Sequence, residues 1–471
     1  MMRFLTLFFI IFSLCFYSQN NNISLENIFS HPSLNTSIIG ISVKDATTGK
    51  IIYEKNSHSQ LVPASIFKLL TTFIAIEKLG ADFKFKTEIY YSGNIRQDTL
   101  FGNLIIKGYC DPTFESRFFS NSALNELVQK IKSKNIKFIK GKLILVSNYF
   151  SSKVNGNWAF EDVNNYYAAV PNPLNIFDNE YHLYFETGAK GQYARVLNIE
   201  PQYEYPPKIV ITSNNVVAKE GGDNAYIYGD PFSYEKRVEG SIPPFQKKYS
   251  IEGCLPDPPR MFAESILKKL SLENIAIAEK NYNIINDTFN LKSFQLLDVV
   301  YSPTLSEIFR LTNLHSINLF AESMLYALGN GDYDNGKKIL LETLIKKGID
   351  KNEINIDDAC GLSRLDGISA NAMTEFLIKA YSSPYKNLLL NGLPVAGESG
   401  TMKNFSDTAP LKGNLKCKTG YFARVRTFAG FLNTKSGKTL AVCIMFNNFN
   451  ASLDKIKQST KQFFETLYQM N

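Results

Sequence analysis

The stretch "LVPASIFKLLTTFIAIEKLG", residues 61–80, opens with a proline, continues as a dense apolar run and stops at a glycine. Pro63 suits the first turn of a helix and Gly80 suits its C-terminal stop, so the pattern predicts a buried helix. Ser65 and Lys68 stand three positions apart at the front of this helix and therefore share one face. They are either a nucleophile with its base or a hydroxyl and an ammonium that are neighbours by chance.

The spacing of the pair has little weight by itself, because four other Ser-x-x-Lys matches begin at Ser233, Ser265, Ser383 and Ser452. What distinguishes Ser65 is its place in the first turn of a buried helix. Backbone N–H groups are unpaired in that turn and the helix dipole is positive there, which favours negative charge on an attacked carbonyl oxygen. A helix cap beside a solvated lysine remains the alternative for the pair taken alone.

The segments around this helix indicate how the chain is organised. The preceding "SIIGISVKDATTGKIIYEKN" predicts a β-hairpin, and "RTFAGFLNTKSGKTLAVCIMFNNF" near the C-terminus predicts a second one, followed by a closing helix. Residues 90–291 instead contain many short β-type runs and one helical pattern, "SALNELVQKIKSKNI". We therefore expect an α+β protein, in which an antiparallel sheet flanked by helices is built from both ends of the chain and the β-rich middle is an insertion.

A chain of 471 residues is too long for one hydrophobic core, because cores stop growing at about 250–300 residues. The changes in composition along the chain set the expected limits of its parts. We expect a signal peptide at 1–18, a first domain formed by 19–92 and 295–471, an inserted β-rich domain formed by 93–172 and 240–294, and a second small β-rich insertion at 173–239.

The N-terminus has the pattern of a secretory signal peptide. Arg3 precedes an apolar run from Phe4 to Phe16, and a polar stretch opens at Ser18. The run is shorter than the roughly 20 residues that span a bilayer, so it predicts export to the periplasm and cleavage near Ser18 without a stable membrane span. The net charge of +7 is spread thinly and argues against a nucleic-acid partner.

Two common classes of hydrolase, the zinc-dependent enzymes and the serine hydrolases that use a histidine base, have little support in the sequence. The four histidines include no helical zinc pair, and no GxSxG motif is present. Five scattered cysteines follow the leader with no CxxC pair, so neither a zinc site nor a disulfide framework is expected. A serine nucleophile without histidine needs another base, and an amine can serve if burial and a neighbouring cation lower its pKa.

Two further motifs complete such a site. Lys418, in "LKCKTGYF", directly precedes the C-terminal hairpin and is the candidate second cation; with Thr419 it could also bind a substrate carboxylate. In "LHSINLFAE", Ser316 offers a hydroxyl to relay a proton, and Asn318 offers an amide to hold a peptide group. The ordered set Ser-x-x-Lys, Ser-x-Asn and Lys-Thr-Gly is much more specific than any of the three motifs alone.

These motifs resemble those of the penicillin-binding protein and serine β-lactamase superfamily. Within it, the chain resembles the class-C low-molecular-mass penicillin-binding proteins, the D-alanyl-D-alanine carboxypeptidase/endopeptidase family. The resemblance runs along most of the mature chain, in "NYYAAVPNPLNIFDN", "VEGSIPP", "SPTLSEIFRLTNLHSINLFAE", "DDACGLSRLDGIS", "LPVAGESGTM" and "KTGYFARVRTFAGFL". It implies a β-lactamase/transpeptidase-like domain, and the long insertion between the first two motifs is itself a mark of this family.

The resemblance also implies roles for single residues. Ser65 corresponds to the acylated serine, Lys68 to its base and Ser316 to the proton relay. Substrate binding falls to a second set, in which the oxyanion hole consists of the backbone N–H groups of Ser65 and Tyr421, and the peptide and carboxylate contacts come from Asn318, Lys418, Thr419 and Gly420. No metal or organic cofactor is implied. Tyr166, Tyr167 and Phe177 are expected to serve packing.

Two departures from the family pattern stand out. Family members often have an acidic residue just after the strand that corresponds to "GKLILVSNYF", where it grips the diamino acid of the stem peptide. Val146, Ser147 and Asn148 occupy that neighbourhood here, which leaves the side-chain preference open. Cys360 stands where the family usually has serine, and a structural role is expected for it.

The resemblance implies a serine-type D-Ala-D-Ala carboxypeptidase or endopeptidase that acts on peptidoglycan stem peptides and is acylated by β-lactams. Two alternatives are a β-lactamase, which would turn penicillin over rapidly, and a catalytically idle protein that holds peptidoglycan with its inserted domains. The sequence does not indicate the oligomeric state or which of the two peptidase activities dominates.

Overall fold

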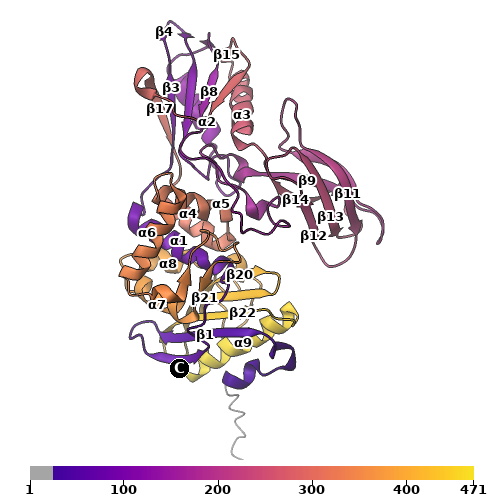
Figure 1. The fold of residues 1–471 in the computed structure, drawn as a ribbon, viewed down its shortest axis with the longest axis vertical. Coiled ribbons are helices and arrows are strands. Elements are labelled where there is room, and N and C mark those ends of the chain that lie inside the picture. The colour runs from indigo at the N-terminus through magenta and orange to yellow at the C-terminus, as the bar shows by residue number, and fades with distance from the viewer. Residues whose placement is uncertain (1–24) are drawn as a thin grey trace, which may run out of the picture.

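The computed structural model describes residues 25–471, and the expected signal peptide lies outside them. The described chain forms an elongated molecule with three lobes (Figure 1). The lower lobe contains both ends of the described chain, the upper lobe follows the first helix, and a third lobe projects from the side. Residues of the lower lobe come from the two ends of the sequence, and the other two lobes come from its middle.

The lower lobe is built on a five-stranded antiparallel sheet in the order β2-β1-β22-β21-β20. β1 pairs with β22 along its whole length, from Ile38 opposite Asn447 to Asp45 opposite Leu440. The two expected hairpins are therefore neighbours in one sheet. Its strands are β1 (Ile38–Asp45), β2 (Ile51–Lys55), β20 (Leu415–Phe422), β21 (Val425–Asn433) and β22 (Thr439–Asn447).

Helices cover both faces of this sheet. Alternate residues of β22 point to opposite faces, so that Val442 packs with α9 while Cys443 packs with the helices around α1. α9 (Leu453–Met470), η1 (Leu25–Phe29) and η2 (Pro32–Leu34) cover the first face. The second face carries η3 (Ala64–Phe67), α1 (Lys68–Leu79), α4 (Leu305–His315), α5 (Asn318–Leu328), α6 (Tyr333–Lys346), α7 (Ala370–Tyr381) and α8 (Lys386–Gly392).

The upper lobe is joined to the lower one through two paired strands. β3 (Lys86–Tyr91), on which the chain enters, pairs antiparallel with β17 (Gln295–Tyr301), on which it returns. They belong to a sheet in the order β16-β8-β6-β3-β17, and a smaller sheet has the order β15-β7-β5-β4. The remaining bounds are β4 (Asn94–Arg96), β5 (Thr99–Phe101), β6 (Leu104–Gly108), α2 (Ala123–Lys132), β7 (Phe138–Ile139), β8 (Leu143–Val146), α3 (Pro258–Leu272), β15 (Ala276–Ile277), β16 (Tyr282–Ile285) and η6 (Leu291–Ser293).

The helix α3 corrects the expectation of a single helix in the middle region. Pro258 occupies its first turn, and the Asp257 side chain accepts a hydrogen bond from the Arg260 N–H as its N-cap. Both are helix-start signals that the sequence displays. They were masked by the β-type runs on either side.

The side lobe consists of two three-stranded sheets, β10-β9-β14 and β11-β13-β12. Its elements are η4 (Tyr166–Ala168), η5 (Phe177–Asn179), β9 (Glu180–Glu186), β10 (Arg195–Glu200), β11 (Val210–Ala218), β12 (Asn224–Tyr228), β13 (Glu235–Ile242) and β14 (Tyr249–Cys254). The short elements left in the lower lobe are η7 (Lys351–Glu353), β18 (Ile354–Asn355), β19 (Gly367–Ile368) and η8 (Gly400–Met402). The domain limits given above stay a prediction.

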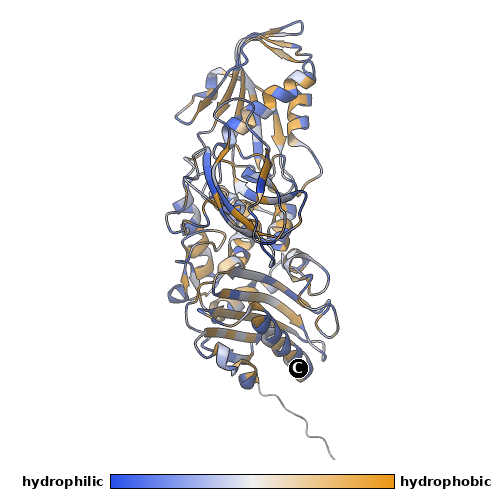
Figure 2. Ribbon diagram, turned by 90° about the vertical axis from the view of Figure 1, so that its right-hand side faces the viewer, coloured by the Kyte–Doolittle hydropathy of each residue, from blue (hydrophilic) through white to orange (hydrophobic). Residues whose placement is uncertain are grey.

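Hydrophobic residues run along the strands and along the inner sides of the helices, while the connecting loops are mostly hydrophilic (Figure 2). All five cysteines within residues 25–471 are buried and unpaired. A search of the described helices finds none that combines the length and the apolar character needed to cross a membrane.

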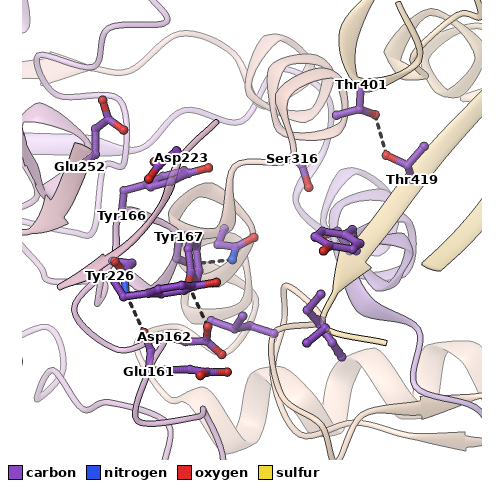
Figure 3. Close-up of a pocket in the computed structure, with 18 of the residues that line it drawn as sticks. Glu161, Asp162, Tyr166, Tyr167, Asp223, Tyr226, Glu252, Ser316, Thr401 and Thr419 are labelled. Carbon is purple, nitrogen blue, oxygen red and sulfur yellow. Dashed lines mark hydrogen bonds between the residues drawn. The ribbon is translucent and has the colours of Figure 1, made fainter. Parts of the chain in front are cut away.

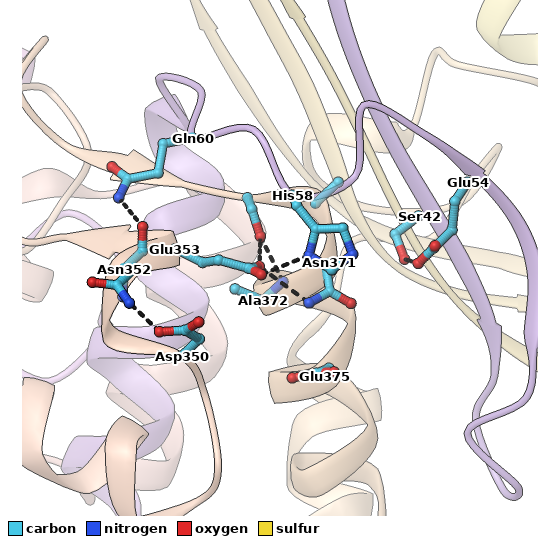
Figure 4. A network of polar contacts seen from close by, with 12 residues as sticks. Ser42, Glu54, His58, Gln60, Asp350, Asn352, Glu353, Asn371, Ala372 and Glu375 are labelled. Atoms are coloured by element: carbon cyan, nitrogen blue, oxygen red, sulfur yellow. Dashed lines mark hydrogen bonds and ion pairs between the residues drawn. The ribbon is translucent and has the colours of Figure 1, made fainter.

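A polar network ties the segment before Ser65 to η7 and α7 (Figure 4). His58 Nδ1 lies 2.6 Å from Glu353 Oε1, and the same carboxylate accepts hydrogen bonds from Ser369 Oγ and Asn371 Nδ2. The hydrogen bond to Glu353 raises the pKa of His58. Because the raised pKa belongs to the folded state, this stabilisation is complete below the unfolded-state pKa and disappears as pH rises through the folded-state pKa.

We expect His58→Gln to lower the melting temperature by about 1–2 °C near pH 5.5 and to leave it unchanged near pH 9. Thermal unfolding of both proteins across this range measures the effect. His31→Gln is the matched control, because the His31 ring is bonded to nearby Ser33. A His58→Gln effect that is equal at all pH values would contradict the expectation.

Candidate active site

Ser65 lies in a short 3-10 turn and not in the α-helix itself. η3 (Ala64–Phe67) leads directly into α1, which begins at Lys68. Ala64 has φ = 49°, in the left-handed region that residues with a side chain rarely adopt. Ser65 was expected in the first turn of the α-helix. The structure instead places it in the tighter 3-10 turn just before α1 begins.

Lys68 is completely buried and faces Ser65. Its Nζ atom lies 2.9 Å from Ser65 Oγ and donates a hydrogen bond of 2.7 Å to the Cys360 carbonyl oxygen. Burial lowers the pKa of Lys68, because the charged ammonium loses its hydration. An amine with a lowered pKa next to a serine hydroxyl can accept the proton of that hydroxyl.

A second buried lysine lies beside the first. Lys418 Nζ on β20 donates a hydrogen bond of 2.9 Å to Ser316 Oγ. Burial, followed by the positive charge of Lys68, holds the pKa of Lys418 well below its usual value. Ser316 is the C-cap of α4 and has φ = 63°, a conformation that turns the chain sharply before α5. The structure thus brings together Ser65, Lys68, Ser316 and Lys418, which are widely separated in sequence.

The expected substrate-binding side chains line the same space. Asn318, at the start of α5, donates from Nδ2 to the Tyr167 carbonyl oxygen at 2.6 Å. Thr419 Oγ1 donates to Thr401 Oγ1 at 2.9 Å. Ser65, Ser316, Asn318 and Thr419 all line one cavity of 610 Å³.

Gly420 allows β20 to approach the Ser65 turn closely. A Cβ atom at this position would lie 2.8 Å from the backbone nitrogen of Ser65 and 2.3 Å from Thr427 Oγ1. Any side chain would therefore displace the strand from the turn. The next residue, Tyr421, also lines the cavity, as Ser65 does.

The cavity has two facing walls (Figure 3). Ser316, Thr401 and Thr419 lie on one wall, while Tyr166, Asp223 and Glu252 lie on the other. Tyr166 and Tyr167 line the cavity, which corrects their assignment to packing alone; Phe177 lies away from it. Nothing in their spacing indicated this, because η4, a short element of the insertion, carries both tyrosines to the site.

The two walls also differ in charge. Glu161, Asp162, Asp223 and Glu252 come from the inserted segments, whereas Arg364 and Arg426 come from the lower lobe. The sequence did not single out these four acidic residues. Arg364 also forms an ion pair of 3.7 Å with Glu161, so the two groups of charges meet within the cavity.

The sequence pattern of the D-Ala-D-Ala carboxypeptidase 3 (S13) family matches residues 21–467. The chain belongs to this family. One relative, the D-alanyl-D-alanine carboxypeptidase of Actinomadura sp. (strain R39), is 25% identical over 445 residues, which are 90% of this chain and 80% of the relative. The D-alanyl-D-alanine carboxypeptidase DacB of Haemophilus influenzae is 25% identical over 453 residues, covering 91% and 90%.

Solved structures agree with the S13 assignment at the level of the fold. Penicillin-binding protein 4 (dacB) from Haemophilus influenzae has a TM-score of 0.79 at 22% identity, and the match covers 95% of this chain and 99% of that one. A predatory peptidoglycan endopeptidase from Bdellovibrio bacteriovorus gives 0.51 at 14% identity, with 92% of each chain covered. The α+β fold with a transpeptidase-like domain is confirmed.

Membership in S13 confirms the expected class-C penicillin-binding protein and its enzyme class, a serine-type D-Ala-D-Ala carboxypeptidase/endopeptidase. The roles of individual residues in this chain stay a prediction. The geometry above is the basis on which they are proposed.

Proposed function

We propose that this S13 peptidase releases the terminal D-alanine of peptidoglycan stem peptides through an acyl-enzyme on Ser65. The observation that carries the proposal is the pair of buried contacts Lys68 Nζ to Ser65 Oγ and Lys418 Nζ to Ser316 Oγ, both 2.9 Å long. These contacts support the roles of Ser65 as nucleophile, Lys68 as its base and Ser316 as proton relay, and both serines line a single cavity.

In the first step, neutral Lys68 accepts the proton of Ser65 Oγ, and the oxygen attacks the carbonyl carbon of the penultimate D-alanine. The backbone N–H groups of Ser65 and Tyr421 stabilise the negative charge that forms on the carbonyl oxygen. The C–N bond then breaks, and Ser316 passes a proton from Lys68 to the departing amine. Water hydrolyses the ester and restores the Ser65 hydroxyl.

Substrate binding follows the charges of the cavity. Lys418, Thr419 and nearby Arg426 suit the terminal carboxylate of the substrate, and Asn318 suits the peptide group before the bond that breaks. Glu161 and Asp162 suit an ammonium group on the diamino acid of the stem peptide. They can supply the acidic contact that Val146, Ser147 and Asn148 do not.

The same chemistry cleaves a cross-link when the leaving amine belongs to a second stem peptide. β-Lactams would acylate Ser65, because they combine a strained amide with a carboxylate. Since peptidoglycan lies outside the cytoplasmic membrane, we also propose export to the periplasm through the signal segment 1–18. Residues 19–92 and 295–471 would form the catalytic domain, and the inserted segments 93–172, 173–239 and 240–294 would complete the far wall of its cavity.

The test is D-alanine release from a purified pentapeptide muropeptide with a free ammonium group on its third residue, compared with the same muropeptide after N-acetylation of that group. We expect release from the first and about tenfold lower kcat/KM for the second. Absence of D-alanine release would leave an idle binding protein, and rapid turnover of penicillin would indicate a β-lactamase instead.

A further inference from the structure

A buried carboxylate lies near Lys68 and does not line the cavity. Glu322 lies on α5, one helical turn after Asn318, and only 2% of it is exposed. Its Oε1 atom accepts the Ala359 N–H at 3.0 Å, and its Oε2 atom accepts the Tyr333 hydroxyl at 2.6 Å. The Cys360 thiol is a further hydrogen-bond partner of the same carboxylate. Glu322 thus holds the loop that carries the Cys360 carbonyl to Lys68.

That loop is fixed by a second carboxylate as well. Asp358 accepts the backbone N–H groups of residues 360, 361, 362 and 363, together with the indole N–H of Trp158. Glu322, Asp358 and Cys360 lie close enough together to be considered as metal ligands. Every carboxylate oxygen of the two acids already accepts a hydrogen bond, however, which assigns the cluster to holding the loop.

The position of the Cys360 carbonyl matters for the direction of proton transfer. A neutral amine has two N–H bonds and one lone pair. When one N–H is bound by the Cys360 carbonyl at 2.7 Å, rotation of the amine is restricted and the lone pair can be directed at Ser65 Oγ, 2.9 Å away. Moving the loop would weaken this orientation even though Lys68 itself stayed in place.

The charge of Glu322 matters in the same step. Lys68 gains a proton while Ser65 attacks, so a positive charge appears at a site that is completely buried. A buried charge is costly unless an opposite charge lies nearby. Burial lowers the pKa of Lys68, and the neighbouring acidic groups of Cys360, Asp358, Glu322 and Asp366 oppose that effect.

We propose that Glu322 is a positioning residue for Lys68, which it serves by holding the Cys360 carbonyl in place and by supplying buried negative charge for the ammonium form. This role rests on the proposed acylation of Ser65. Burial raises the pKa of Glu322 to about 7. The titratable groups that face Glu322 are Tyr326 on its own helix, Tyr333 of α6, Asp358 and Cys360 of the loop, Lys68 of α1 and Cys110 of the insertion.

The experiment measures the rate constant of acylation by a fluorescent penicillin between pH 5 and pH 10. In the wild type, the rate should rise with pH as Lys68 becomes neutral. Because Glu322 favours the charged form of Lys68, we expect Glu322→Gln to move this rise to lower pH by about 1 unit and to lower the plateau about tenfold. A purely structural role would lower the rate without moving the rise.

Two further variants make the result decisive. Tyr333→Phe removes one hydrogen bond that favours ionised Glu322. The increase of the acylation rate should therefore move to lower pH, by a smaller amount than in Glu322→Gln. If Glu322→Gln does not fold, the Tyr333→Phe variant by itself tests the role of Glu322. Glu353→Gln is the matched control, since that carboxylate bonds His58 and Asn371 instead, and its rise should coincide with the wild type.

The possible failures can be told apart. An unlabelled wild type overturns the acyl-enzyme on Ser65 and, with it, the role of Glu322. If the wild type is labelled, and its acylation rate increases over the same pH range as in the folded Glu322→Gln and Tyr333→Phe variants, the role of Glu322 is overturned. The acyl-enzyme on Ser65 then still stands.

Discussion

Ser65→Ala should abolish covalent labelling by fluorescent penicillin and lower D-alanine release at least about 10⁴-fold. The reason is that Ser65 Oγ, which lines the cavity, lies 2.9 Å from the amine of Lys68, the proposed base, and is the proposed nucleophile. The stability of the protein should change little, because the substitution removes one oxygen atom beside a cavity. Labelling on a gel and an assay of released D-alanine measure the two effects.

Ser265→Ala is the matched control for this variant. Ser265 and Lys268 also form a Ser-x-x-Lys pair, and they lie on the helix α3 of the upper lobe. They line a different pocket, far from Ser316 and Lys418 in the fold. Labelling should be normal in Ser265→Ala, and labelling that survived in Ser65→Ala would place the nucleophile elsewhere.

Lys68→Met should lower the rate of acylation by about 10³–10⁴-fold and should not destabilise the fold as a charge deletion at an ion pair would. Methionine is similar in length to lysine but cannot accept a proton. Lys68 makes no ion pair within residues 25–471, and it is fully buried, so the apolar side chain avoids the cost of burying an amine. The Cys360 carbonyl loses its donor, which offsets part of that gain.

The measurements are the acylation rate and the melting temperature of the same sample. A melting temperature within about 3 °C of the wild type, combined with the loss of rate, would show that Lys68 is needed for acylation and contributes little to the stability of the fold. Lys457→Met is the control, because Lys457 lies on α9 and bonds the Asn404 carbonyl. A Lys68→Met enzyme that is acylated at the normal rate would remove Lys68 from the role of base.

Local patterns predicted most of the lower lobe. The hairpin of β1 and β2, the hairpin of β21 and β22 and the closing helix α9 each have a pattern that depends on near neighbours in sequence. Dependence on near neighbours also explains why the helix α3 was missed. Its start signals at Asp257 and Pro258 stand among β-type runs, which favoured a β prediction for the whole region. Five residues were singled out as site candidates because they belong to short motifs, and the spacing of a motif is visible in the sequence. They are Ser65, Lys68, Ser316, Asn318 and Lys418.

The far wall of the cavity could not be found in this way. Glu161 and Asp162 belong to a loop, and Asp223 and Glu252 belong to the side lobe, without a shared spacing among them. Glu322 ends the stretch "LHSINLFAE" that contains Ser316 and Asn318, but its sequence context is that of an ordinary helical residue. Its partners Tyr333 and Ala359 come from two other segments, so its burial and its contacts depend on how those segments pack.

The sequence by itself determined the family and the fold class, and it supplied the candidate set Ser65, Lys68, Ser316, Asn318 and Lys418, because motif order and residue type are properties of the chain. Only the tertiary structure decided that Lys68 is fully buried between Ser65 and the Cys360 carbonyl, and that an acidic wall from the insertion faces Thr419. Burial, the distances between charges and the pKa of an amine depend on atoms that the fold brings together from distant segments.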